Sequence, residues 1–549
     1  MRAPRIPPIA MSAGAFDPWI HSPTCAKMRS VSILIAGETC GAVVEAPRAG
    51  LLVDGRDFYR AVYQALGQAE RSILMAGWQF DGIVELLRGD DADKAPGPCD
   101  FVGYLRYLCE TKPELEIDIL AWDASAVFSF ERMPLQRLVF ERRGHERIHY
   151  RMDNCHPPGG SHHQKLIAVD RSIAFIGGMD VCSSRWDDRE HRAVQPLRCS
   201  RKRPYAPYHD VQAFVTGDAV DVLRGWFIDR WKLATHSELA SEVPRRSIDI
   251  DATLEVSAPA VGLTRTWPEM DGCPIQATRE LKELHLRAIA AAERMIYVEN
   301  QYFSCDEIER AMVERMEAWR GGTPLEIAIV LPEKSAGMKE RLSIGVYQAK
   351  ILRSLTDTAA RTGHRVGVYY SAVQGPEGDV PVFIHAKVMA VDDRFLLVSS
   401  ANFTNRSMSY DSELGLAWEA PVESPSIRAA RIDLMREHVG LPAEAAEAAL
   451  GPIPGLVDRL NAMAGAGHRL RIHRRNQDER PGKFLSWFIP DDPPFDPDHI
   501  EDMLPEPGVW LDRMLRDPLV MFGHGGRQLF RRTRRRLSRK SRHARGRSG

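Results

Sequence analysis

The chain has 549 residues, of which 44% are hydrophobic and 27% are charged, and its formal net charge is -1. This composition is ordinary for a globular protein, and the length admits two domains of about 200 residues each. No apolar run approaches the roughly 18 residues of a membrane span, and Pro and Asp interrupt the first residues, so we expect neither a transmembrane segment nor a cleavable leader.

The small net charge conceals a strong asymmetry. Residues 527–549 hold 11 Lys and Arg and no acidic residue, which leaves 62 basic against 74 acidic residues, a net charge of -12, in the rest of the chain. Such a polybasic block predicts a disordered tail with an attraction to anionic lipid or nucleic acid.

The predicted elements begin after a lead-in, residues 1–50, which is rich in Pro and Ala and is expected to be loosely ordered. In residues 51–250, a helical pattern in "GRDFYRAVYQALG" leads into an apolar strand from Ile73 to Met75, and "LEIDILAWD" predicts another strand. Apolar strands bounded by polar loops and alternating with helices predict an α/β layer structure for this first lobe.

Residues 251–440 repeat that plan. The helix "TRELKELHLRAIAAAERM" is followed by strands "IYVEN" and "LEIAIVL" and by a long helix beginning at "KERLSIG". Beyond residue 440 the pattern weakens into a C-terminal extension, residues 441–526, before the basic tail. We therefore predict two similar lobes of the α-β-α sandwich class.

A short motif, His-x-Lys-x-x-x-x-Asp, occurs once in each lobe, and the two copies are 222 residues apart. "GWQF" at residues 77–80 and "ENQY" at residues 299–302 have the same separation. One offset shared by two pairs of segments indicates a duplicated unit. The six motif residues form the predicted catalytic set: His163, Lys165, Asp170, His385, Lys387 and Asp392.

In a strand, residues i and i+2 face the same side, so each histidine is expected to project beside its lysine. If the lobes pack about a pseudo-twofold axis, the two His-Lys pairs meet in one pocket suited to a phosphate diester. Two lysines neutralise the phosphoryl oxygens, one imidazole attacks phosphorus, and the other protonates the leaving alkoxide, without a metal or other cofactor. Asp170 and Asp392 follow the buried part of each strand, where we expect them to organise the strand end by hydrogen bonds.

A histidine with such a role needs a carboxylate to fix its tautomer. Asp210 in "YHDVQAFVTG" and Glu413 in "DSELGLAW" stand in apolar, strand-like contexts and are the predicted histidine-orienting acids. His162 is expected to be a neighbour of the site, because the strand register gives the site face to His163.

The sequence resembles the phospholipase D superfamily, whose pattern is two copies of His-x-Lys-x4-Asp-x6-Gly-(Gly/Ser)-x-Asn. The copies here are "HQKLIAVDRSIAFIGGMD" and "HAKVMAVDDRFLLVSSAN". The neighbouring "GGMDVCSSRWD", "YVENQYF" and "SSANFTNRSMSYDSE" are similar to the phosphatidylcholine-cleaving, eukaryotic-type branch. The resemblance runs from about Leu51 to Ala420.

This resemblance implies that His163 is the nucleophile that forms a phosphohistidine, and that His385 protonates the leaving alcohol and later activates water. Lys165, Lys387 and Asn402 would bind phosphate, with Ser400 and the adjacent serine as further hydroxyl donors. Asp180 stands where the family pattern has Asn, so a carboxylate replaces an amide there.

Three functions are compatible with this pattern. The first is a phospholipase D that hydrolyses phosphatidylcholine-like lipids to phosphatidic acid and a free head group, with transfer to other alcohols. The second is a cardiolipin-synthase-type phosphatidyltransferase, disfavoured by the lack of N-terminal membrane helices, and the third is a nucleic-acid phosphodiesterase, disfavoured by the acidic body. The expected partner is a phospholipid surface, the expected state is a monomer, and the expected location is the cytoplasm or a membrane surface.

Overall fold

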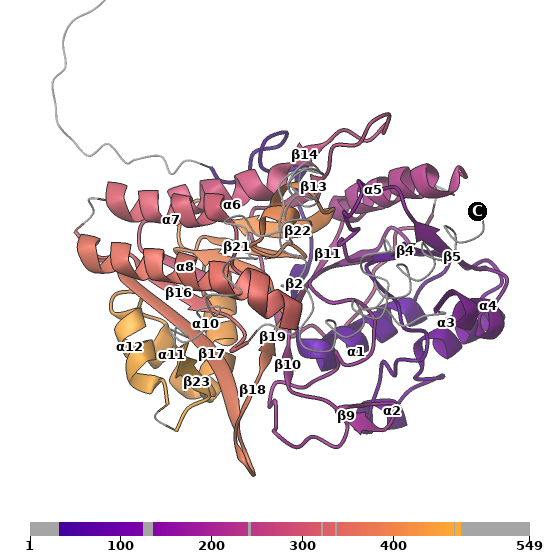
Figure 1. Cartoon of the computed structure of the whole chain (residues 1–549). Helices are drawn as coiled ribbons and strands as arrows, with labels where there is room; N and C mark the ends of the chain where they lie inside the picture. Colours follow the sequence, from indigo (N-terminus) through magenta and orange to yellow (C-terminus); the bar gives the residue numbers. More distant parts are fainter. Residues whose placement is uncertain are drawn as a thin grey trace, which may run out of the picture.

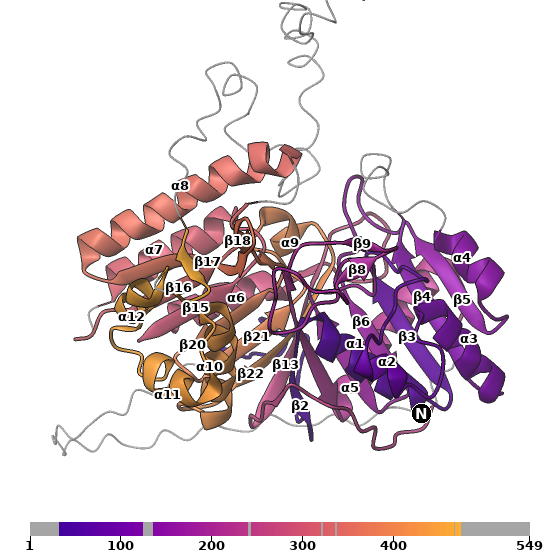
Figure 2. The same ribbon diagram turned by 90° about the horizontal axis from the view of Figure 1, so that it is seen from below.

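The computed structural model describes residues 32–123, 136–239, 243–319, 322–334, 338–465 and 467–473. The predictions for residues 1–31, for most of the C-terminal extension and for the basic tail lie outside the described residues. The described part forms two lobes that lie side by side in both views (Figures 1 and 2), the first coloured indigo to purple and the second magenta to orange.

The first lobe is built on an eight-stranded sheet. Strands β3, β4 and β5 at one end of the sheet run parallel, and the other strands pair antiparallel. In spatial order the strands are β12 (Leu254–Glu255), β2 (Ala49–Val53), β11 (Val211–Thr216), β7 (Ile173–Gly177), β6 (Leu166–Val169), β3 (Ser72–Gly77), β4 (Glu116–Trp122) and β5 (Ile148–Asp153).

The second lobe is built on an eleven-stranded sheet. Nine strands form one path, in the order β1 (Ala42–Val44), β13 (Ala260–Trp267), β22 (Glu413–Glu419), β21 (Phe395–Ser399), β20 (Val388–Val391), β15 (Met295–Glu299), β16 (Glu326–Val330), β17 (Arg365–Gly375) and β18 (Gly378–Pro381). Two more strands lie off this path: β14 (Thr278–Arg279) pairs with β13, and β23 (Leu470–Ile472) pairs with β17.

The two sheets share one topology over seven strands. The order β2-β11-β7-β6-β3-β4-β5 of the first lobe matches β13-β22-β21-β20-β15-β16-β17 of the second, with the same parallel and antiparallel pairings. Strands β6 and β20, which follow the two motif lysines, are equivalent in this order. The duplication inferred from the two motifs therefore extends over these seven strands of each sheet.

Helices cover both faces of each sheet. In the first lobe, α1 (Asp54–Gly67), α3 (Phe101–Thr111) and α4 (Gln136–Arg143) cover one face and α5 (Asp218–Thr235) the other. In the second, α6 (Glu280–Ala290), α7 (Asp306–Ala318) and α8 (Met338–Thr362) face α10 (Pro425–Val439), α11 (Ala443–Leu450) and α12 (Leu456–Met463) across the sheet. Figure 1 shows equivalent layers on opposite sides of the molecule, as a pseudo-twofold rotation places them.

The helix boundaries follow from local sequence. Helix α1 buries Phe58, Tyr59, Val62 and Leu66, a spacing of three and four residues that puts one apolar face on the sheet. Helix α10 starts at an N-cap serine and an N1 proline, "SP", and its C-cap is Gly440, whose left-handed φ of 77° favours a residue without a Cβ.

The junction between the lobes is partly apolar and partly made of short strand pairs. One hydrophobic core runs from β2, β11 and α5 into β22 and α10. Short β10 (Tyr208–His209) of the first lobe pairs parallel with β19 (Phe383–Ile384) of the second, and a parallel bridge joins His162 to Ser412. The remaining short elements are α2 (Asp90–Asp93), α9 (Asn405–Ser409), β8 (Cys199–Ser200) and β9 (Arg203–Pro204).

The predicted fold class is confirmed: the protein is α/β, with two α-β-α lobes about a pseudo-twofold axis. Several segments differ from the expected boundaries. Residues 42–44 of the predicted lead-in form β1 and residues 470–472 of the extension form β23, because strands β13 and β17 of the second sheet offer backbone groups for pairing. Strand β2 begins at Ala49 in the predicted lead-in, and β12, beyond residue 250, pairs with β2 of the first sheet. None of the helices in the described ranges combines the length and the apolar character that crossing a bilayer requires.

Candidate active site

The two motif histidines lie at the junction of the lobes, just before strands β6 and β20. Each backbone N–H is held by a carbonyl of the other lobe: His163 N donates to Ser412 O at 2.9 Å, and His385 N donates to His209 O at 2.8 Å. The His-x-Lys segments therefore belong to the inter-lobe strand pairs, and the strands that follow them, "LIAV" and "VMAV", are fully buried.

Each histidine is oriented by a carboxylate of the opposite lobe. His163 Nδ1 lies 2.9 Å from Glu413 Oε2 and 3.0 Å from Oε1, and His385 Nδ1 lies 2.7 Å from Asp210 Oδ2. With Nδ1–H donated to a carboxylate, each ring keeps Nε2 for the reaction. The side chains of His163 and His385 are 19% and 12% exposed, whereas both carboxylates are fully buried.

The hydroxyl of Ser400 supports Glu413, the acid that orients His163. It donates to Glu413 Oε2 and accepts from Leu414 N at 3.0 Å, and the residue is fully buried. The equivalent position in the first lobe, 222 residues earlier, is Gly178, where an added Cβ would lie 2.5 Å from Asp210 Oδ1. The expectation that Ser400 binds phosphate is therefore replaced by a role in holding the histidine-orienting acid.

The two lysines are buried and differ in their partners. Lys165 Nζ lies 3.2 Å from Asp180 Oδ2, and Lys387 Nζ donates to Gln301 Oε1 at 3.3 Å and to the carbonyl of His385. Asp180 and Asn402 occupy equivalent positions.

The carboxylate of Asp180 has a second contact, because its Oδ1 accepts a hydrogen bond from Trp78 N at 2.8 Å. Asn402 Oδ1, in contrast, has no hydrogen-bond partner among the described residues. The exchange of Asn for Asp thus gives Lys165 an ion pair with a carboxylate in the first lobe, at a position where the second lobe has the neutral Asn402.

Asp170 and Asp392 lie at the far ends of β6 and β20 and bind backbone. The carboxylate of Asp170 accepts from the N–H groups of residues 70–72 at 2.9 Å, and that of Asp392 accepts from residues 293–295 at 2.7–2.8 Å. Their φ angles, 47° and 54°, are left-handed. These contacts give Asp170 and Asp392 a structural role at the strand ends, as we expected from their positions after the buried part of each strand.

His162 points away from the site. Its Nδ1 lies 2.9 Å from Ser412 Oγ, and its Nε2 lies 3.3 Å from Asp153 Oδ2. Burial lowers the pKa of His162 to about 4, so the ring is neutral at pH 7.

One cation at the site was not predicted. The guanidinium of Arg185, in the segment "SSRWD", lies 4.9 Å from the ring centre of Tyr208, and that ring lies 5.5 Å from the ring of His385. Burial is the main cause that lowers the pKa of both His385 and Lys387, and the positive charge of Arg185 acts in the same direction. Arg185 lies 22 residues after His163, within the segment "GGMDVCSSRWD" that carries part of the family resemblance, but nothing in that segment marked it as a site residue.

The electrostatics of the site favour an anion. Burial, followed by the charges of Lys387, Arg185, Lys165 and His163, lowers the pKa of His385 well below its usual value. Burial lowers the pKa of Lys387 to about 7, with Asp210 opposing and Lys165 adding to the shift. Cations from both lobes thus crowd one another, and an anionic group bound between them relieves this repulsion.

The fold and the site define a duplicated α/β protein with one composite site, in which each lobe supplies a His-Lys pair and the carboxylate for the other lobe's histidine. A family model described as "Cardiolipin synthase, PLD-like domain" matches residues 285–430. The predicted resemblance to the phospholipase D superfamily is thus confirmed over these residues.

Curated relatives point to the eukaryotic-type branch. Phospholipase D A of Dictyostelium discoideum is 25% identical over 471 residues, which cover 71% of this chain and 35% of that protein. Phospholipase D alpha 4 of Arabidopsis thaliana is 23% identical over 500 residues, covering 70% of this chain and 64% of that protein. The chain thus spans about a third of the first relative and less than two thirds of the second.

Among solved structures, a phosphatidylserine synthase of Haemophilus influenzae aligns with a TM-score of 0.48 and 13% identity, over 72% of this chain and 88% of that one.

Proposed function

We propose that this protein is a phospholipase D that hydrolyses the terminal phosphodiester of glycerophospholipids such as phosphatidylcholine, through a phosphohistidine. The observation that carries the proposal is the crossed pair of contacts, His163 with Glu413 and His385 with Asp210. Two histidines held with Nε2 free, next to buried lysines, supply a nucleophile, a general acid and charge neutralisation for one phosphate diester.

In the first step, His163 Nε2 attacks phosphorus as the bond to the head-group oxygen breaks. A proton moves from His385 Nε2 to the leaving alkoxide, which departs as a neutral alcohol, and Glu413 stabilises the positive charge on His163. Lys387 and the amide of Asn402 hold the phosphoryl oxygens. Because the substrate anion offsets the repulsion among the site cations, binding favours the protonated form of His385 that this step needs.

In the second step, neutral His385 takes a proton from water while the water oxygen attacks phosphorus. The N–P bond to His163 breaks, phosphatidic acid is released, and both rings return to their starting states. An alcohol in place of water gives a transferred phosphatidyl group by the same path, so hydrolysis and transfer share one intermediate.

A phosphatidyltransferase of the cardiolipin-synthase type is the second candidate, favoured by the description of the family model that matches residues 285–430. Such an enzyme differs in the acceptor, since a lipid alcohol replaces water. A nucleic-acid phosphodiesterase needs the same histidine chemistry but a cationic groove, and the body of the chain, with a net charge of -12 outside residues 527–549, disfavours it.

The test incubates the full chain with vesicles of phosphatidylcholine, phosphatidylethanolamine and phosphatidylglycerol, with and without ethanol, and in parallel with single-stranded DNA. Mass spectrometry identifies the products. Phosphatidic acid, free choline and phosphatidylethanol support the proposal; cardiolipin as the main product favours the second candidate; cleavage of DNA alone contradicts both.

Site variants distinguish the activity of this protein from that of a contaminating enzyme. His163→Ala and His385→Ala are each expected to lose on the order of a thousandfold or more in turnover, because neither lobe holds both a nucleophile and an acid. His236→Ala is the matched control, since His236 is exposed at the end of α5. Near-normal turnover in either site variant would contradict the shared site.

A further inference from the structure

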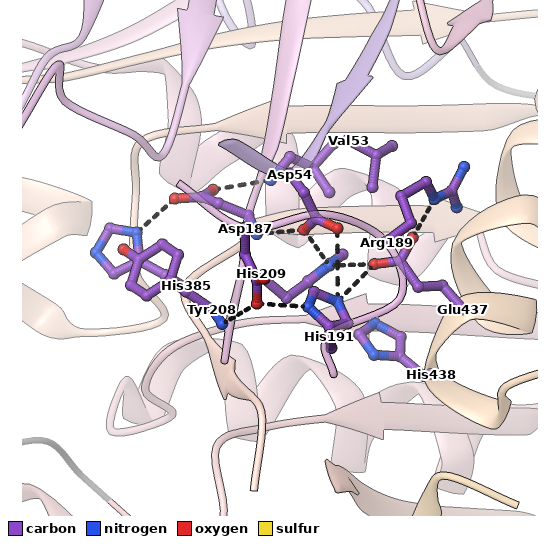
Figure 3. A network of polar contacts seen from close by, with 12 residues as sticks. Val53, Asp54, Asp187, Arg189, His191, Tyr208, His209, His385, Glu437 and His438 are labelled. Atoms are coloured by element: carbon purple, nitrogen blue, oxygen red, sulfur yellow. Dashed lines mark hydrogen bonds and ion pairs between the residues drawn. The ribbon is translucent and has the colours of Figure 1, made fainter. Parts of the chain in front are cut away.

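A second cluster of titratable side chains lies behind the His385 half of the site, in the interior of the junction (Figure 3). We call it the inter-lobe cluster; its members are Asp54, His191, His209 and Glu437, which are 0–3% exposed. One nitrogen or oxygen of each side chain lies within 4.8 Å of the corresponding atom of the other three. No step of the proposed reaction uses these residues.

Four separate segments bring the cluster together. Asp54 is the first residue of α1, with a left-handed φ of 66°, and His209 belongs to β10. His191 lies in the loop after β7, and Glu437 in the last turn of α10, so three members come from the first lobe and one from the second.

Both imidazoles are held from outside the cluster by a further carboxylate. His191 Nδ1 lies 3.0 Å from Asp187 Oδ2, and His209 Nε2 lies 2.9 Å from Glu299 Oε2. A carboxylate that accepts the outer N–H of a histidine, and so turns the other ring nitrogen inward, is the arrangement found behind metal-ligating histidines.

The inner face of the cluster leaves one carboxylate oxygen without a donor in the described part of the chain. His209 Nδ1 lies 2.8 Å from Glu437 Oε1 and 3.0 Å from Asp54 Oδ1, and His191 Nε2 lies 3.0 Å from the same Glu437 Oε1. Asp54 Oδ1 also accepts from Asp210 N at 3.3 Å. Asp54 Oδ2 remains without a hydrogen bond among the described residues, 3.5 Å from His191 Nε2.

We propose that Asp54, His191, His209 and Glu437 bind one divalent metal ion of the zinc type. Two imidazole nitrogens and two carboxylate oxygens form a ligand set that zinc accepts. The ion replaces the two protons that the rings would otherwise carry, so the net charge of the buried cluster is the same in both states. The outer contacts, including Arg189 Nε on Glu437 Oε2 at 2.5 Å, then hold the ligands in place.

The proposed ion has a structural role at the junction of the lobes and takes no part in binding the substrate. The carbonyl of His209 accepts from His385 N, and Asp210, which orients His385, is the next residue. Asp54 N also donates to Asp210 O at 2.8 Å. Binding at the inter-lobe cluster therefore fixes β10 against β19 and joins α10 of the second lobe to α1 of the first.

The test measures metal directly and does not depend on activity. The full chain is stripped with a strong chelator, reloaded with ZnCl2 or MnCl2 and desalted, and the metal content per chain and the Tm are measured. We expect about one Zn²⁺ per chain and a higher Tm than in the stripped protein, since a ligand that binds only the folded state stabilises it.

Two variants localise the ion. Glu437→Gln and His191→Gln are expected to weaken zinc binding at least tenfold. Asp433→Asn is the matched control, because Asp433 contacts the same Arg189 at 2.8 Å but lies outside the cluster. The zinc content of this variant should equal that of the wild type.

Failure of the stripped wild-type protein to take up zinc or manganese, with an unchanged Tm, would overturn the proposal and leave the cluster as a protonated network. Stoichiometric zinc that persists in both cluster variants would also overturn it, since the ion would then lie elsewhere. A variant that does not fold still leaves the wild-type measurement and the other variant decisive.

Discussion

Glu413, on β22 of the second lobe, holds the imidazole of His163 in the first lobe, with 2.9 Å between Oε2 and Nδ1. Asp210 of the first lobe does the same for His385 of the second. Because each lobe completes the histidine of the other, neither half of the duplication has a working site alone. This crossing makes the roles of the two acids separable by experiment.

A substrate whose leaving group needs no proton, such as a p-nitrophenyl phosphodiester, separates the two steps. With Asp210→Asn, we expect a burst of about one p-nitrophenol per chain followed by turnover slowed on the order of a hundredfold, because His163 still attacks but His385 is a poor base. With Glu413→Gln, the attack itself is slow and no burst appears. Stopped-flow absorbance measures both. The reverse pattern would make His385 the nucleophile.

Arg185 is expected to bind the phosphate anion together with the lysines. Arg185→Met removes this charge and should lower kcat/KM about tenfold to a hundredfold, the range for a lost charge-assisted hydrogen bond. Arg192→Met, at an exposed position nearby in the chain, is the control. Equal kinetics in the two variants would show that Arg185 only packs on Tyr208.

The pH dependence of kcat/KM should report the loss of the positive charge on Lys387. Burial lowers the pKa of this lysine to about 7 in the free site. A lysine with a lowered pKa loses its charge as the pH rises through that value, so binding of the phosphate anion is strongest below pH 7 and weakens above it. We expect kcat/KM to fall from pH 7 to pH 9 in the wild type. Lys387→Arg keeps its charge and should move this fall to higher pH; a wild-type profile that stays flat to pH 9 would contradict the assignment.

Initial rates should survive excess EDTA, since lysines neutralise the phosphate charge that a metal would otherwise neutralise. The proposed zinc in the inter-lobe cluster does not alter this expectation, because its ligands are 0–3% exposed and no step of the proposed reaction uses them. Rates measured immediately after EDTA addition, with and without added zinc, check it. An immediate loss that zinc restores would mean that the metal takes part in the reaction.

Removing residues 527–549 should weaken action on anionic vesicles and spare a soluble short-chain substrate. The segment carries 11 cations and lies outside both repeats. Its attraction should fade as salt is raised, because a Debye length of about 10 Å at 0.1 M screens exposed charges. Turnover of both forms across a salt series measures this. An equal loss on both substrates would assign these residues to the fold, and a selective loss of DNA binding would favour the nucleic-acid alternative.

Much of the architecture could be predicted from the sequence. The 222-residue offset predicted the duplication, and periodicity located elements such as α1 and β4, because apolar spacing of 3.6 and continuous apolar runs follow directly from burial. The edge strands β1 and β23 were missed, since an edge strand of three residues has too few buried side chains to leave a pattern.

The sequence by itself predicted which residues do the chemistry: His163, Lys165, His385 and Lys387 stand in two copies of one motif with the same spacing. It also marked Asp210 and Glu413 as acids in buried strands. Only the tertiary structure decided which acid serves which histidine, that Ser400 holds Glu413, and that Arg185 and the inter-lobe cluster lie near the site. The reason is that local spacing sets the direction of a side chain, whereas contacts between strands and between lobes depend on how the sheets form and pack.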